Sequence, residues 1–142
     1  MASQFDAAGE SIPTATLAVR GVVALVLALV GNGLLLGAVL AADLVASIQQ
    51  LSVGPVALFT VLGVLGATLV FGLLTRRSDQ PDRTFVGAAA VVLLLSFGPD
   101  YWVLQNEPGA TIGAVVVLMV MHVVVAVASV VALTDRYSPI AR

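Results

Sequence analysis

The strongest constraint on the fold is a set of four long, continuous apolar runs, at about residues 17–42, 53–74, 84–103 and 111–133. Hydrophobic residues make up 60% of the chain and charged residues only 10%, whereas a soluble domain carries about 25% charged residues. About 20 apolar residues in a helix cross the hydrocarbon core of a bilayer. The runs lack the alternation of polar and apolar residues that the strands of a membrane barrel require. We therefore expect an all-α fold with four transmembrane helices.

The connections between the runs are short, which favours antiparallel neighbours and an up-down-up-down bundle in which the first and fourth helices are also adjacent. We expect residues 1–16 to form a flexible cytoplasmic tail, residues 17–137 to form one transmembrane domain, and residues 138–142 to form a second cytoplasmic tail. The sequence contains no internal repeat and no sign of a second domain.

The basic residues predict the orientation. All six are arginines, placed at the start of the first run, between the second and third, and after the fourth: Arg20, Arg76, Arg77, Arg83, Arg136 and Arg142. The other two connections contain none. Because cytoplasmic loops carry an excess of Lys and Arg, we expect both termini in the cytoplasm. Tyr101 and Trp102 fall on the opposite side, where aromatic residues favour the membrane interface.

Small residues predict where the helices pack, because helix association in lipid depends on close backbone approach rather than on the hydrophobic effect. Gly33 and Gly37 form a GxxxG pair in the first run, and Gly63 and Ala67 lie on one stripe of the second. We interpret all four as helix-packing positions inside the bundle. The alternative for Gly33 and Gly37 is a homodimer surface.

Polar residues within the apolar runs are the candidates for chemistry. His122, the only histidine, lies near the centre of the fourth run, Ser129 follows on the same helical stripe, and Asn32 lies at a similar depth in the first run. Ionisable residues inside a membrane often mark ion or proton pathways, so these three form a candidate midplane polar site. The alternative is a neutral His122 held by Asn32 or a backbone carbonyl, an interhelical contact worth about 1 kcal/mol.

Two observations favour the structural interpretation of His122. No Asp or Glu lies inside the clearly apolar stretches to complete a proton site. One histidine, in a chain without cysteine, cannot supply the three or four ligands of a zinc site. We therefore expect no metal and no other cofactor.

The segment Gly98-Pro99-Asp100 complicates the third run, whose clearly apolar part covers residues 84–97. That part reaches only about 21 Å as a helix, less than the core thickness of about 30 Å. Either the helix includes polar residues at both ends, or it breaks near Pro99. Interrupted helices bind ions in transporters, but a break so close to the outer surface favours an ordinary helix end.

Asp43, Asp100 and Glu107 are the acidic residues expected on the outer side. Three carboxylates form a candidate outer-face site for a divalent ion. They are spread over two loops without the spacing of an ion cage, so we favour solvated loop charges. Asp43 and Asp100 can also terminate helices.

Three motifs carry a resemblance to a known family: Gly54-Pro55-Val56-Ala57, Leu93-Leu94-Leu95-Ser96-Phe97-Gly98-Pro99 and Met121-His122-Val123-Val124-Val125-Ala126. On these motifs the chain resembles, over nearly its whole length, a family of four-helix membrane proteins described as domain of unknown function 6069. The resemblance implies a four-helix membrane fold and draws attention to His122 and Pro99. It implies no reaction.

The sequence as a whole predicts an integral protein of the cell membrane that is not an enzyme, because no nucleophile–base pair, carboxylate dyad or metal cluster lies within the runs. We favour a structural, interaction or accessory role, with the lipid bilayer and a second copy or another membrane protein as partners. No basic cluster is large enough for nucleic acid. The alternative is a small transporter or channel for protons or cations that uses His122 and Asn32.

Overall fold

The computed structural model describes residues 12–45 and 48–135. These residues form four helices and no strand: α1 (Thr14–Ala41), α2 (Val53–Arg77), α3 (Pro81–Asn106) and α4 (Ile112–Leu133). Each helix is long and apolar enough to cross a membrane, so the predicted all-α fold with four membrane-spanning helices is confirmed. The predicted C-terminal tail and most of the predicted N-terminal tail lie outside the described residues.

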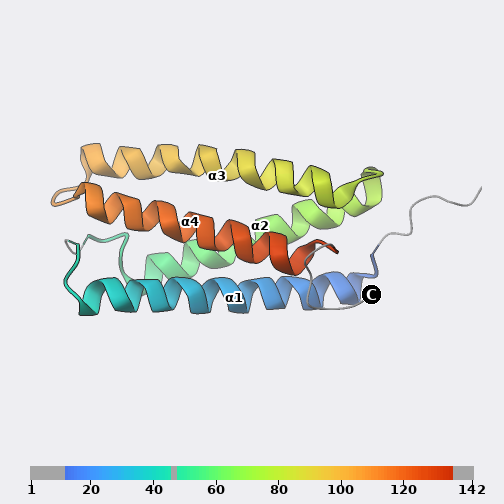
Figure 1. Cartoon of the computed structure of the whole chain (residues 1–142), viewed down its shortest axis with the longest axis horizontal. Coiled ribbons are helices and arrows are strands. Elements are labelled where there is room, and N and C mark those ends of the chain that lie inside the picture. The colour runs from blue at the N-terminus through green and yellow to red at the C-terminus, as the bar shows by residue number, and fades with distance from the viewer. Residues whose placement is uncertain (1–11, 46–47, 136–142) are drawn as a thin grey trace, which may run out of the picture.

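The four helices form an antiparallel bundle (Figure 1). Helices adjacent in the chain pack together, α1 packs against α4 as expected, and α2 also contacts α4 across the bundle, whereas the backbones of α1 and α3 do not approach each other within the described residues. The start of α1, the turn between α2 and α3 and the end of α4 lie together at one end. We call it the arginine end, for Arg20, Arg76, Arg77 and Arg83. The other is the acidic end, for Asp43 and Glu107.

Asp43 terminates α1. It has a φ of 50°, in the left-handed region that commonly follows the last turn of a helix. The Leu44 N–H donates to the Val39 carbonyl at 3.1 Å, and the Asp43 N–H donates to the Leu40 carbonyl at 3.2 Å. This pair of bonds is the Schellman arrangement, which satisfies carbonyls at the helix end. Asp43 therefore terminates a helix, which is one of the three interpretations that the sequence offered for it.

Helix α3 continues through Pro99 to Asn106. An ordinary helix end at Pro99 is therefore wrong, and the alternative, a helix that includes polar residues at both ends, is correct. Proline removes one backbone hydrogen bond from a helix interior, and membrane helices tolerate it because neighbouring groups and local adjustments compensate. The continuation has a consequence for the site, because it places Asp100 inside a helix.

Gly21 and Gly31 bring α1 close to its neighbours, whereas Gly33 and Gly37 of the GxxxG pattern do not. A Cβ added at Gly33 or Gly37 would meet no atom within 4 Å, because both residues lie on the outer surface of α1. The interpretation of these two as packing positions inside the bundle is wrong. At Gly31, an added Cβ would lie 2.8 Å from a methyl group of Val124, so α1 and α4 approach there. At Gly21, it would lie 3.0 Å from the Thr68 side chain of α2.

The two predicted packing positions of α2 do face other helices. A Cβ at Gly63 would lie 3.1 Å from Val125 of α4. Ala67 packs against the cluster at the arginine end, whose buried members are Phe71, Phe85 and Leu133. The rings of Phe71 and Phe85 meet edge to face with centroids 5.1 Å apart, which is a favourable aromatic geometry. This cluster closes the bundle between α2, α3 and α4 at the arginine end.

Candidate functional site

Two ionisable side chains, one in the middle of α4 and one in the outer half of α3, face each other. His122 lies in the middle of α4, and its side chain leans back along the helix toward Leu118, as helical side chains do. Asp100 of α3 meets it there, with Oδ2 3.1 Å from His122 Nδ1. The Asp100 side chain is 7% exposed and that of His122 is 39% exposed. The expectation that no carboxylate accompanies His122 is therefore wrong, because α3 extends past Pro99.

The contacts of the His122 ring define its hydrogen positions. Nδ1 lies 2.9 Å from the Leu118 carbonyl oxygen as well as 3.1 Å from the Asp100 carboxylate. Both neighbours are acceptors, so Nδ1 carries a hydrogen. In the neutral ring Nε2 is then an acceptor, and in the charged ring it is a second donor. Nε2 is thus the atom with which His122 can bind another molecule.

Asn32 bonds to α2 rather than to His122. Its Nδ2 lies 2.9 Å from Thr60 Oγ1, and the two residues are each 2% exposed. The Asn32 Oδ1 atom is buried and has no hydrogen-bond partner among the described residues. Thr60 can donate as well as accept, so reversing the amide would keep this bond and leave the NH2 group unpartnered instead. In either orientation one polar atom of Asn32 lacks a partner.

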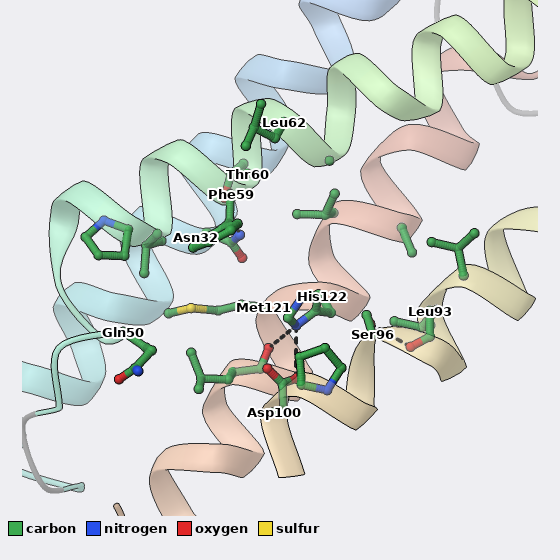
Figure 2. Close-up of a pocket in the computed structure, with 18 of the residues that line it drawn as sticks. Asn32, Gln50, Phe59, Thr60, Leu62, Leu93, Ser96, Asp100, Met121 and His122 are labelled. Carbon is green, nitrogen blue, oxygen red and sulfur yellow. Dashed lines mark hydrogen bonds and ion pairs between the residues drawn. The ribbon is translucent and has the colours of Figure 1, made fainter. Parts of the chain in front are cut away.

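A cavity of about 560 Å³ joins these groups. Asn32, Thr60, Asp100 and His122 all line it, and most of the remaining lining is apolar and comes from α2, α3 and α4. Figure 2 shows Asn32 and Thr60 on one side of it and Asp100 and His122 on the other. The structure thus brings Asn32 and His122 to one site, although across a space and not in contact.

The cavity opens between α2 and α3. Its lining includes Phe59 and Leu62 of α2 and Val92 of α3, which are 66%, 53% and 64% exposed. The two helices lie close together at the arginine end and diverge toward the acidic end (Figure 1). In a membrane, this opening would face the lipid chains.

Gln50, in the connection between α1 and α2, also lines the cavity. Its Nε2 donates to Glu107 Oε2 at 3.3 Å, and its own Oε1 is buried without a hydrogen-bond partner in the described part of the chain. Gln50 was not predictable from the sequence, because it lies in a connection and its role depends on the position of Glu107.

The three acidic residues predicted to form an outer-face site are separated by these contacts. Asp43 ends α1, Asp100 faces His122 and Glu107 binds Gln50. Within residues 12–45 and 48–135, no three His, Cys, Asp or Glu side chains are grouped to hold a metal ion.

Ser129, the third residue of the predicted midplane site, is 2% exposed. Its hydroxyl has no hydrogen-bond partner among the described residues, and it is not part of the cavity lining. The structure therefore brings His122 and Asn32 to one cavity but leaves Ser129 apart from it.

Arg20 has a structural role that its predicted place at the membrane surface did not indicate. It is 1% exposed, its Nη1 donates to the Leu133 carbonyl at 3.0 Å, and its Nη2 lies 2.7 Å from Asp135 Oδ1. A cation at the C-terminal end of a helix is favourable because unpaired carbonyls point outward there. Arg20 therefore ties α1 to the end of α4.

Comparison with known proteins provides a family but no function. No curated protein and no solved structure matches the chain. The sequence pattern of the family of unknown function DUF6069 matches residues 7–139. This range covers all four helices and every residue of the site, and it confirms the resemblance expected from the motifs. The chain belongs to the family of unknown function DUF6069.

Proposed function

We propose that this protein is a non-enzymatic, multi-pass protein of the cell membrane that binds a small molecule in the cavity between α2, α3 and α4. The observation that carries the proposal is the combination of an apolar cavity with a few polar groups: the Asp100–His122 pair and the unpartnered amide atom of Asn32. Small-molecule sites typically have volumes of about 300–1,000 Å³, with apolar walls and a small number of polar groups that orient the ligand.

The energetics of a membrane interior support an occupant. Polar atoms without partners in an apolar medium cost several kcal/mol, and Asn32, one of the residues that line the cavity, has such an atom in its side chain. Helix association in lipid depends on van der Waals packing, so a space of about 560 Å³ is unfavourable when empty. A ligand that fills the space and bonds to the polar atoms removes both costs.

The distribution of charge supports an orientation with the arginine end in the cytoplasm, following the excess of basic residues on that side of membranes. All arginines of the described residues belong to the arginine end, and the exposed rings of Tyr101 and Trp102 lie near the opposite end of α3. The cavity opening would then lie in the outer half of the bilayer.

A binding role is preferred to catalysis because, within residues 12–45 and 48–135, no side-chain nucleophile is hydrogen-bonded to His122. The hydroxyl of Ser96, which also lines the cavity, donates to the Leu93 carbonyl of its own helix at 2.6 Å. An Asp–His pair beside an apolar cavity can bind a ligand without taking part in a chemical step.

A substitution in the cavity and a matched control on the surface of the same helix test the proposal. Ala89 lines the cavity, whereas Ala90, the next residue of α3, is exposed and does not line it. Ala89→Phe should fill part of the cavity and reduce the amount of bound small molecule that native mass spectrometry detects on the purified protein. Ala90→Phe should leave that amount unchanged. Equal occupancy in both variants and the wild type would show that no ligand uses this cavity.

A second candidate function is the transport of protons or cations, and the contact between Asp100 and His122 inside two helices favours it. Ionisable pairs within membrane helices are common in proton relays. The test is ion flux in proteoliposomes that contain a pH-sensitive dye. If His122→Leu folds and abolishes a flux that the wild type shows, transport is supported. If neither protein shows flux, this second function is rejected.

The interaction role that the sequence favoured has one further support. Gly33 and Gly37 lie on the outer surface of α1, where a second copy or another membrane protein can approach the backbone closely. Cysteine crosslinking at Gly33 in native membranes tests it, because the chain contains no other cysteine.

A further inference from the structure

The polar groups of the cavity favour one chemical class of ligand, and this inference rests on the ligand-binding function proposed above. We propose that the cavity binds a cationic amphiphile, with a protonated amine beside Asp100 and His122 and an apolar body against α2 and α3. Three properties of the described residues lead to this class: a surplus of hydrogen-bond acceptors, an excess of negative charge, and an apolar wall that opens toward lipid.

Acceptors predominate among the unpartnered polar atoms of the residues that line the cavity. The Gln50 amide is oriented by its bond to the Glu107 carboxylate, which requires a donor, so the unpartnered Gln50 atom is an oxygen. In the amide orientation that the structure has, the unpartnered atom of Asn32 is a second oxygen, whereas the reversed amide would present its NH2 group instead. Nε2 of a neutral His122 is a third acceptor. A ligand head group with several N–H donors would satisfy such atoms better than a head group made of acceptors.

With the His122 ring neutral, the charged groups near the cavity have one sign. Asp100 lines it, and Glu107 binds Gln50 at its edge. The described arginines all belong to the opposite end of the bundle (Figure 1). In an interior of low dielectric constant a carboxylate acts on a nearby charge much more strongly than it would in water. An ammonium group is therefore favoured over a neutral head, and an anionic head is disfavoured.

The rest of the lining suits a hydrocarbon body. Figure 2 shows Phe59 and Leu62 of α2 on one side and Leu93 of α3 on the other side of the cavity that holds His122. The gap between these helices is the exposed opening described above, so an amphiphile dissolved in the bilayer can reach the cavity sideways. Its chain would remain against apolar side chains while its head reached the Asp100–His122 pair.

The experiment compares ligands that share one dodecyl chain and differ only in the head group. Apparent dissociation constants are measured by native mass spectrometry in an uncharged detergent at neutral pH. The primary ammonium should bind at least about tenfold more tightly than the alcohol, a ratio that corresponds to about 1.4 kcal/mol, and the sulfonate should bind most weakly. The trimethylammonium compound, which has charge but no N–H donor, should fall between the ammonium and the alcohol.

Two substitutions test the cause of this preference. Asp100→Asn should reduce the ratio between ammonium and alcohol to near one. Gln50→Lys keeps a donor toward Glu107 and adds a positive charge at the edge of the cavity, so it should weaken ammonium binding and strengthen sulfonate binding. Gln50 lies outside the helices, so this second variant gives a result even when Asp100→Asn does not fold.

The outcomes separate this inference from the function on which it rests. If the alcohol or the sulfonate binds as tightly as the ammonium, and Ala89→Phe abolishes that binding, the cavity is a ligand site but the cationic class is wrong. If none of the four compounds binds, or if Ala89→Phe leaves binding unchanged, both proposals fail.

Discussion

Replacing Arg20 with methionine is expected to destabilise the bundle by about 3 kcal/mol. Arg20 is almost completely buried and holds both the Leu133 carbonyl and the Asp135 carboxylate. Removing one partner of a buried ion pair costs about 3–5 kcal/mol. The lower part of this range applies because the Asp135 side chain is 23% exposed, so water can solvate it after the substitution. Methionine retains most of the apolar stem of arginine, which limits the loss of packing.

The measurement is the free energy of unfolding in mixed micelles, followed by circular dichroism as the denaturing detergent is increased. Arg20→Met, Asp135→Asn and the double variant form a double-mutant cycle, and we expect a coupling energy of about 1–2 kcal/mol between the two positions. Arg83→Met is the matched control, because Arg83 belongs to the same end of the bundle but is exposed. Its effect should stay within about 0.5 kcal/mol.

Two results would refute this reasoning. If Arg20→Met is as stable as Arg83→Met, the buried guanidinium does not hold α1 and α4 together. If the effects of Arg20→Met and Asp135→Asn simply add, the stability depends on the side chains separately and not on their ion pair.

Three further predictions use the same unfolding assay. Gly31→Ala should destabilise the bundle by about 1 kcal/mol, because the crowded contact costs about 1–3 kcal/mol and the higher helix propensity of alanine offsets about 1 kcal/mol of it. Gly33→Ala, on the outer surface, should be neutral or stabilising. Equal effects of the two substitutions would contradict the packing described. Thr60→Val should cost about 1 kcal/mol, and the loss should disappear in an Asn32→Leu background. Thr111→Ala should cost about 1 kcal/mol, because this hydroxyl caps α4, and Thr111→Ser should restore most of the loss.

The helices were predictable from sequence because their signal does not depend on tertiary contacts. A bilayer requires long apolar segments whatever their neighbours are, so each run indicated a helix by itself. Local packing faces were less predictable. Residues of a helix are separated by about 100° around its axis, and Gly33 and Gly37 lie one position beyond Asn32 and Leu36. That single step turns them from the buried face of α1, where Asn32 and Leu36 lie, to the outer surface.

The polar pairs were not predictable because they depend on how far each helix extends and how the helices are staggered. Asp100 was assigned to an outer loop because the clearly apolar part of the third run ends at Phe97, although the predicted run itself extends to residue 103. Six residues of helix beyond Asp100, up to Asn106, place this carboxylate about two turns below the end of α3, within reach of His122. A sequence signal for this continuation exists in Tyr101 and Trp102, since aromatic residues at a membrane interface often belong to the helix itself.

The two ends of the bundle differ in a way that explains where the cavity lies. At the arginine end, the ion pair of Arg20 joins α1 to α4, and the edge-to-face contact of Phe71 and Phe85 joins α2 to α3. Arg20, Phe71 and Phe85 are buried, so both contacts would have to break before the helices could separate there. At the other end α2 is free to diverge from α3, and the gap exposes Phe59 and Val92. A ligand that enters sideways therefore meets the polar groups without disturbing the contacts that hold the four helices together.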